Sequence, residues 1–321
     1  MINTSLIDHM VNRRHALKAV TGLGTSALAM GSLPVAAGTI MGGSRKINFD
    51  DPAQNLNAWA KVLGNTDPTQ ETLSWFGGHI FAVQKDKPLQ KLVGVEGIGV
   101  LRIEPQGDNV FHLFNREMAF YKDPNTEEIV DVWRNPLIDE EIEVVPIHNM
   151  TVNAEVAPIQ KMDFDGTMVE QPFNPPWWLI DDSAMSLFEV HAAFPNPMTA
   201  DKWPRESAGP VSRISEIFQR FSSLAEIEDE SKTSADYVGT WTRIGPWLPW
   251  MLMGQTDGHV LYRTYMKKLI SKDQLEPKFR DKVEERFPEY FQAPAPDTWG
   301  GHNDSSFSTY MAERAPQPAK E

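Results

Sequence analysis

The sequence predicts an α+β fold made mainly of one antiparallel, barrel-like sheet, a meander with flanking helices. Two observations favour this class. From Ser74 to about Asn153 the hydrophobic residues recur with a period of two, as they do in half-buried strands. The turns in this region begin with Asp-Pro or Asn-Pro, which are typical of short connections. Consecutive strands joined by short turns form a meander, and a meander is consistent with part of a barrel.

A helix is expected before the sheet. The run Asp50-Asp51-Pro52 combines a capping aspartate with a proline that fits the first helical turn. Apolar residues then follow at helical spacing until Gly64 ends the run, namely Leu56, Trp59, Ala60 and Leu63.

Three strands are expected in the meander itself. The longest runs from Phe111 to Tyr121, and the other two run from Ile129 to Trp133 and from Ile142 to His148. Two turn-plus-strand units, DPNTEEIVDV and NPLIDEEIEV, look alike and start 12 residues apart. The repetition indicates successive hairpins.

The second half of the chain is expected to mix strands with helices. Strands are predicted at 187–194, 237–244 and 259–267, and a helix at 274–287. A further helix is predicted from Pro210 to Asp229, because six apolar residues fall on one helical face: Val211, Ile214, Ile217, Phe218, Phe221 and Leu224. From Ala293 the chain is a proline-rich tail.

The N-terminal segment predicts export. A basic stretch containing Arg13 and Arg14 precedes an uncharged run rich in small residues, which ends Pro-Val-Ala-Ala at position 37. Paired arginines in this layout indicate a twin-arginine signal over residues 1–37, and therefore the twin-arginine export machinery as a partner. The run is too polar, and too often interrupted by glycine, for a stable membrane span. We expect residues 38–321 to form a single barrel-like domain, periplasmic or extracellular.

Composition excludes several functional classes. The 321-residue chain has a formal net charge of −14, so a nucleic-acid partner is not expected. It has no cysteine, which excludes disulfides and thiolate chemistry. The common nucleotide-binding, zinc-protease and serine-hydrolase motifs are missing. The histidines have no metal-ligand spacing, and a metal site would need the fold to bring His112, His148 and His191 together. We therefore expect no cofactor and no metal.

The stretch from Trp241 to Gln255 concentrates aromatic surface on a proline-braced loop. A rigid loop loses little entropy when a ligand binds, and rings beside a guanidinium suit an aromatic, oxygenated or acidic small molecule. The alternative is that the rings simply fill one end of the barrel. A second aromatic group precedes Asp181. The predicted ligand-binding residues are Trp133, Trp177, Trp178, Trp241, Arg243, Trp247 and Trp250.

Acid–base chemistry needs a base, an acid and a group that stabilises charge. On the strand from Phe111 to Tyr121, His112 and Arg116 share a face with apolar residues, where such groups are costly to bury unless they react or pair. The alternative for Arg116 is a structural salt bridge to Asp131 or Glu117. A register shift of one residue would exchange the faces. The predicted catalytic residues are His112, Arg116, Asp131, His191 and Tyr262.

The segment from Trp241 to Tyr262, the run from Arg116 to Tyr121 and the paired turns resemble the bacterial family of uncharacterised proteins known as domain of unknown function eighteen thirty-eight. The resemblance covers most of the chain after residue 37, and it implies twin-arginine export but no reaction. Members of the family usually have Thr-Gly-Glu in each turn. Here those places read Thr126-Glu127-Glu128 and Ile138-Asp139-Glu140. Loss of glycine where φ is positive predicts a reshaped turn.

Three hypotheses for function follow. The first is an exported, cofactor-independent enzyme of the lyase or isomerase type, acting on an apolar, aromatic or terpenoid-like small molecule through acid–base side chains. The second is a non-catalytic carrier of a hydrophobic ligand. The third and weakest is a metal-dependent oxidoreductase, because export in the folded state suits a protein loaded with metal beforehand.

Overall fold

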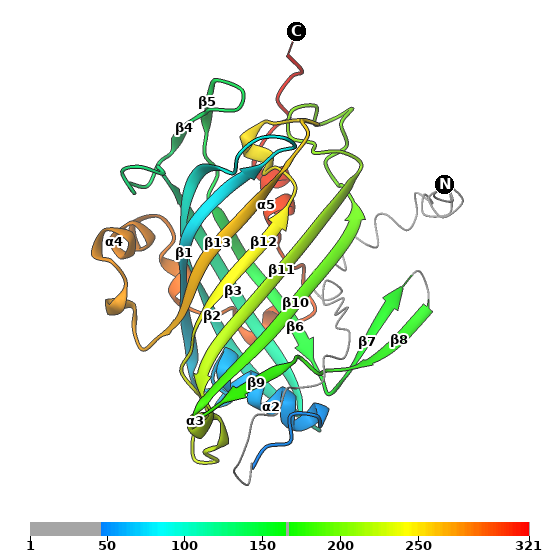
Figure 1. The fold of residues 1–321 in the computed structure, drawn as a ribbon, viewed down its shortest axis with the longest axis vertical. Helices are drawn as coiled ribbons and strands as arrows, with labels where there is room; N and C mark the ends of the chain where they lie inside the picture. The colour runs from blue at the N-terminus through cyan, green and yellow to red at the C-terminus, as the bar shows by residue number, and fades with distance from the viewer. Residues whose placement is uncertain (1–45, 165–166, 321) are drawn as a thin grey trace.

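The computed structural model describes residues 46–164 and 167–320. Its centre is one antiparallel sheet of nine strands in the order β6-β3-β2-β1-β13-β12-β11-β10-β9. The sheet curls into a half-barrel, with β10 to β13 and β1 on the near side of Figure 1 and β2, β3 and β6 behind them. This confirms the predicted fold class. Arg13 and Arg14, and with them the whole predicted signal, lie outside the described residues.

The nine strands form two meanders that meet where β1 pairs with β13. Two small two-stranded sheets, β4-β5 and β7-β8, stand apart from the main sheet. The strands are β1 (Glu71–Val83), β2 (Gln90–Gly107), β3 (Val110–Lys122), β4 (Val132–Asn135), β5 (Glu140–Glu143), β6 (Ile147–Val156), β7 (Ile159–Phe164), β8 (Thr167–Pro172), β9 (Trp177–Ile180), β10 (Ser183–Pro195), β11 (Val211–Ser223), β12 (Val238–Gly245) and β13 (His259–Leu269).

Helices cover one end and part of the outer face of the half-barrel (Figure 1). The predicted first helix is confirmed as α2 (Pro52–Leu63). Asp51 accepts hydrogen bonds at its N-terminus, and the Gly64 backbone N–H donates to the Ala60 carbonyl at its C-terminus. The predicted helix at 274–287 is confirmed as α4 (Pro277–Arg286), which packs Phe279 and Val283 against outward residues of β2 and β3. The remaining helical segments are α3 (Leu224–Glu228), α5 (Ser306–Glu313), and the 3₁₀ turns η3 (Pro249–Met251), η4 (Lys272–Gln274), η5 (Pro288–Phe291) and η6 (Pro296–Thr298). No helix among the described residues is long and apolar enough to cross a membrane.

The helix predicted from Pro210 to Asp229 is wrong. Residues 211–223 form β11, and only residues 224–228 are helical. The inward positions of β11 are mainly polar, because Ser212, Arg220 and Ser222 are buried. Its outward positions mix polar residues with Val211, Ile217 and Phe221, and Phe221 is 40% exposed. Because both faces mix polar and apolar residues, the strand lacks the period of two that a strand normally shows.

The two strands predicted after β3 are only partly right. The first is shifted along the chain to β4, and the second is divided between β5 and β6. Because β4 and β5 pair with each other rather than with the main sheet, they form a short ribbon at one end of the half-barrel (Figure 1). Short strands with turn residues at both ends leave little pattern from which to place their boundaries.

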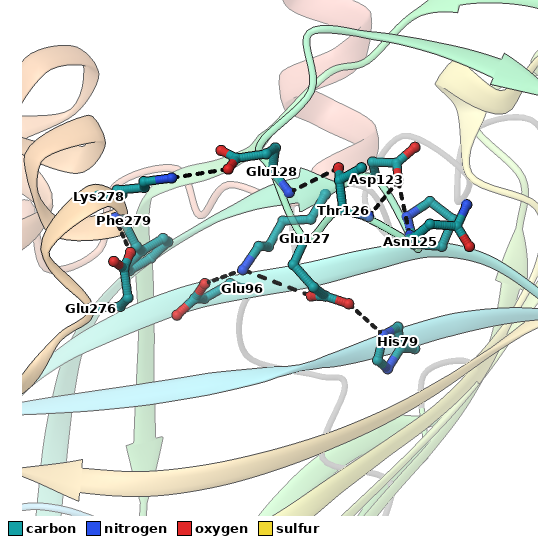
Figure 2. Close-up of polar contacts among 12 residues, drawn as sticks. His79, Glu96, Asp123, Asn125, Thr126, Glu127, Glu128, Glu276, Lys278 and Phe279 are labelled. Atoms are coloured by element: carbon teal, nitrogen blue, oxygen red, sulfur yellow. Dashed lines mark hydrogen bonds and ion pairs between the residues drawn. The ribbon is translucent and has the colours of Figure 1, made fainter.

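The expectation of reshaped turns is also wrong, because Glu127 and Asp139 both keep a positive φ, of 61° and 56°. Figure 2 shows how the first turn is held. The Asp123 carboxylate accepts hydrogen bonds from two backbone N–H groups of the turn. The Glu127 carboxylate lies 3.1 Å from His79 Nε2 and 3.9 Å from Lys122 Nζ. These contacts offset the strain of a left-handed glutamate.

Candidate functional site

The face of β3 that carries His112 and Arg116 points outward, so the expectation that it faces the interior is wrong. His112 stacks on Trp299 at 3.5 Å between ring centroids and places Nε2 3.2 Å from a Glu155 carboxylate oxygen. Arg116 donates hydrogen bonds to the backbone oxygens of Met150 and Glu289. Both side chains hold the C-terminal segment against the outside of the sheet.

The other predicted catalytic residues are scattered. The Asp131 carboxylate is largely exposed and accepts a hydrogen bond from Arg286 at 2.6 Å. His191 is exposed, with Nδ1 3.0 Å from the Ser215 hydroxyl. Only Tyr262, which is fully buried, points into the half-barrel. The catalytic role predicted for His112, Arg116, Asp131 and His191 stays a prediction that their positions do not support.

Most of the predicted ligand-binding tryptophans pack as core. Trp133 meets Trp250 edge to face at 5.7 Å, and both are buried. Trp177 packs on Phe49 and donates to Asn55 Oδ1 near α2, whereas Trp178 lies on the opposite side of its strand and is half-buried. The positions of these tryptophans therefore favour the alternative interpretation, in which the rings fill one end of the barrel, over a role in lining a ligand-binding pocket.

The last two members of the cluster, Trp241 and Trp247, are also buried. Trp241 is stacked on Phe218, with its ring 5.4 Å from that of Tyr262. Trp247 lines a small cavity together with Arg243 and Phe307, and its Nε1 donates to the Thr256 carbonyl. Arg243 is the residue from the predicted ligand set that reaches the larger pocket described next.

The main candidate site is a pocket of about 190 Å³ in the hollow of the half-barrel. β3 and β6 supply one side and β10, β11 and β12 the other, while α5 and the residues before it cover the space between. In Figure 1, α5 lies behind β12, within the curl of the sheet. Most of the pocket wall is apolar and includes Val190, Ala192, Ile214, Phe307 and Met311.

Three residues with carboxyl groups line this pocket, namely Glu117, Glu216 and Asp304. Glu117, on the inward face of β3, accepts a hydrogen bond from Asn149 Nδ2 at 2.7 Å. Burial raises the pKa of Glu117, and the neighbouring Glu216 carboxylate raises it further, although the Asn149 hydrogen bond and Arg243 act in the opposite direction. Glu117 lines the pocket and is half-buried. Glu117 is therefore the group in this pocket best suited to hold a proton.

An ion pair completes the polar side of the pocket. Arg243 Nε lies 3.4 Å from Glu216 Oε1, across the β11–β12 pair. Burial works against the Arg243 cation, but Glu216 and nearby tyrosines outweigh it and raise its pKa. Its guanidinium lies 5.7 Å from the ring centre of Tyr262, whose own pKa burial raises well above the ordinary range. The pocket thus has a fixed positive charge that is balanced by a fixed negative one.

The segment that covers the pocket is tied to the edge of β6. Asn303 Oδ1 accepts from the backbone N–H of Asn153, and its Nδ2 donates to the carbonyl of the same residue. The carboxylate of Asp304 accepts from the backbone N–H groups of Met150 and Thr151. These side chains occupy positions that another strand would take, so the edge of the sheet is covered and α5 is held over the hollow.

Sequence reasoning missed Glu117, Asn149 and Glu216. Glu117 lies on the face of the predicted strand opposite to His112, so a correct assignment of the inward face would have identified it. Glu216 was hidden by the helical interpretation of β11. His112, His148 and His191 have separate partners, and no group of three metal-ligating side chains occurs within residues 46–164 and 167–320.

The fold and the pocket together define a β half-barrel with a partly polar internal cavity. The chain belongs to the family described as Protein of unknown function (DUF1838), whose family model matches residues 69–313. The match begins just before β1 and ends at the last residue of α5, so it includes every wall of the pocket. A comparison with curated proteins finds no match.

Proposed function

We propose that the protein binds a small, mostly apolar molecule in the hollow of the half-barrel and moves a proton on it, as a lyase or isomerase does, without an organic cofactor. The observation that carries the proposal is Glu117, a carboxyl with a raised pKa in an apolar pocket and next to an arginine. Structural carboxylates are seldom placed in this way, because burial penalises their charged form.

The size and charge of the pocket suggest the class of ligand. A cavity of about 150 Å³ accommodates benzene, so about 190 Å³ suits a substituted single ring or an aliphatic compound of similar size. When Glu117 is protonated, Arg243 is balanced by Glu216, and the remaining carboxylate of the lining, Asp304, accepts hydrogen bonds from two backbone N–H groups of β6. An uncharged ligand with one carbonyl or hydroxyl oxygen fits this balance best.

The positions of Glu117 and Arg243 in the pocket suggest how a proton would be transferred. The protonated carboxyl of Glu117 can donate its proton to a ligand oxygen or carbon and accept one back as the carboxylate. When the ionised carboxylate of Glu117 instead takes a proton from a ligand carbon, the negative charge left on the ligand would lie close to Arg243, which does not need to reorganise to stabilise it. If Glu117 acts as the acid, the rate falls as the pH rises through its raised pKa.

Solvent-proton exchange tests the proposal. A panel of one-ring ketones and alcohols, acetophenone among them, is incubated with the full chain in D₂O. Binding is followed by saturation-transfer NMR and deuterium incorporation by proton NMR. We expect at least one compound to bind and exchange, binding to be lost in Ala192→Phe, which fills the pocket, and exchange alone to be lost in Glu117→Gln.

Two other outcomes are informative. Binding that Ala192→Phe abolishes, without exchange in the wild type, would favour the hydrophobic-ligand carrier. Equal binding of every compound by the wild type and Ala192→Phe would contradict both forms of the proposal.

Export, which the sequence of residues 1–37 favours, would place this chemistry in the periplasm or outside the cell, and cell fractionation of the tagged full chain tests it.

A further inference from the structure

A second buried cation lies further along β11, two inward positions beyond Glu216. Arg220 is 6% exposed, and no carboxylate of the described residues lies within ion-pair distance of it. Its Nε and Nη1 atoms are buried without a hydrogen-bond partner. The rings of Phe218 and Tyr237 each lie 5.4 Å from its Cζ atom. Ring contacts stabilise the charge but leave these N–H donors unused.

Unused hydroxyl groups surround this guanidinium. Ser186 on β10 lies directly opposite Arg220 in the sheet, and Ser222 is the next inward residue of β11. The hydroxyls of both serines are buried without a partner. Buried donors without acceptors cost free energy, and native proteins seldom leave several of them together. Arg220, Ser186 and Ser222 thus all have hydrogen-bond donors without an acceptor.

The distribution of charge around Arg220 also favours an anion at this place. Lys268 lies nearby, and its Nζ donates to the carbonyls of Gly64 and Ala235. Burial lowers the pKa of Lys268 to about 7, and the positive charge of Arg220 contributes to that shift. Asp236 and Glu226 favour the charged form of Lys268, but Asp236 is exposed and the Glu226 carboxylate is bound to Lys232. Two cations therefore share one region of the interior without a buried counter-charge of their own.

An open cleft lies beside this region and reaches Ser222. Its volume is about 460 Å³, and Ser222, Tyr237 and Lys268 form its inner wall. Of the acidic residues at its rim, Asp182 accepts hydrogen bonds from the Ser223 hydroxyl and a backbone N–H. The stacked pair of Phe218 and Trp241 lies between Arg220 and the pocket that holds Glu117.

We infer that Arg220, Ser186 and Ser222 form a buried binding site for a small oxyanion, a carboxylate or phosphate group that enters through the cleft beside Lys268. The oxyanion would supply an acceptor for the unpaired Nε and Nη1 of Arg220 and for both serine hydroxyls, and a negative charge next to the buried guanidinium. The inference uses none of the groups assigned to proton transfer, so either proposal can fail without the other.

Thermal unfolding of the full chain near neutral pH tests the site. Sodium phosphate, sodium acetate and sodium chloride are compared at matched ionic strength, with tryptophan fluorescence as the readout. We expect a saturable rise in Tm of about 4–5 °C at about a hundred times Kd for phosphate or acetate, and no such rise for chloride. The better of the two oxyanions identifies the ligand group. If both behave as chloride does, the site does not exist.

Two variants locate the effect. In Arg220→Met the response to the oxyanion should disappear, while Tm in chloride should not fall, because the variant removes an unpaired buried charge. The matched control is Arg213→Met, an exposed arginine on the same strand, which should respond as the wild type does. An undiminished response in Arg220→Met would overturn the inference. If that variant does not fold, Ser186→Ala, which should weaken the apparent affinity, replaces it.

Discussion

Replacing Glu117 with glutamine should remove a pH dependence of stability that the wild-type protein shows. Because the pKa of this carboxyl is raised in the folded state, its contribution to stability is complete below the unfolded pKa and is lost as the pH rises through the folded pKa. Between these two values the folded chain holds one more proton than the unfolded chain. The free energy of unfolding therefore falls by about 1.4 kcal/mol for each pH unit in that window.

The assay is urea unfolding of the wild type and of Glu117→Gln at a series of pH values above the unfolded pKa. The glutamine side chain can still accept the hydrogen bond from Asn149, so the difference between the two proteins isolates the titration. Glu141→Gln, at an exposed position of β5, controls for loss of a negative charge. A difference between wild type and Glu117→Gln that stays constant with pH would refute the raised pKa and remove the basis for proton transfer.

Three further predictions concern stability, each measured by urea unfolding at fixed pH. Arg243→Gln should cost about 2–4 kcal/mol by leaving the half-buried Glu216 without its partner, and the double variant with Glu216→Gln should recover part of the loss. Gly239→Ala should cost about 2–3 kcal/mol, because the new Cβ would lie 2.1 Å from the Gln219 carbonyl oxygen; a neutral effect would mean that the strands can separate there. Glu127→Gly should be more stable than Glu127→Ala by about 1 kcal/mol, since both lose the carboxylate but only glycine relieves the positive φ; equal stability would show that the turn is not strained.

The parts of the fold that the sequence predicted are those with strong local signals. The capped helix α2, the long strand β3 and strands β10, β12 and β13 all have periodic patterns bounded by turn residues, and each is present. The pairing of β1 with β13 carries no local signal, because the two strands are far apart in the chain and meet only through tertiary packing. Fold class therefore followed from the sequence, but strand order did not.

The candidate site was less accessible to sequence reasoning, for a specific physical reason. Both faces of β3 are rich in apolar residues, because helix α4 and the C-terminal segment cover the outside as the core fills the inside. Alternation alone cannot tell which of two apolar faces is the inner one. His112 and Arg116 looked like polar groups in a core, and they are instead the polar groups that hold a covering segment in place.

Strand β11 connects the failure of prediction with the function we propose. An ordinary strand of a half-barrel places apolar residues inward, and β11 places Glu216 and Arg220 there while Ile217 and Phe221 face outward. This arrangement buries charge and exposes apolar surface, and both choices lower stability relative to the reverse pattern. Sequences depart from local consistency mainly where binding or catalysis requires it. The strand that sequence rules misassigned is therefore the strand on which both the proposed proton-transfer pocket and the proposed oxyanion site depend.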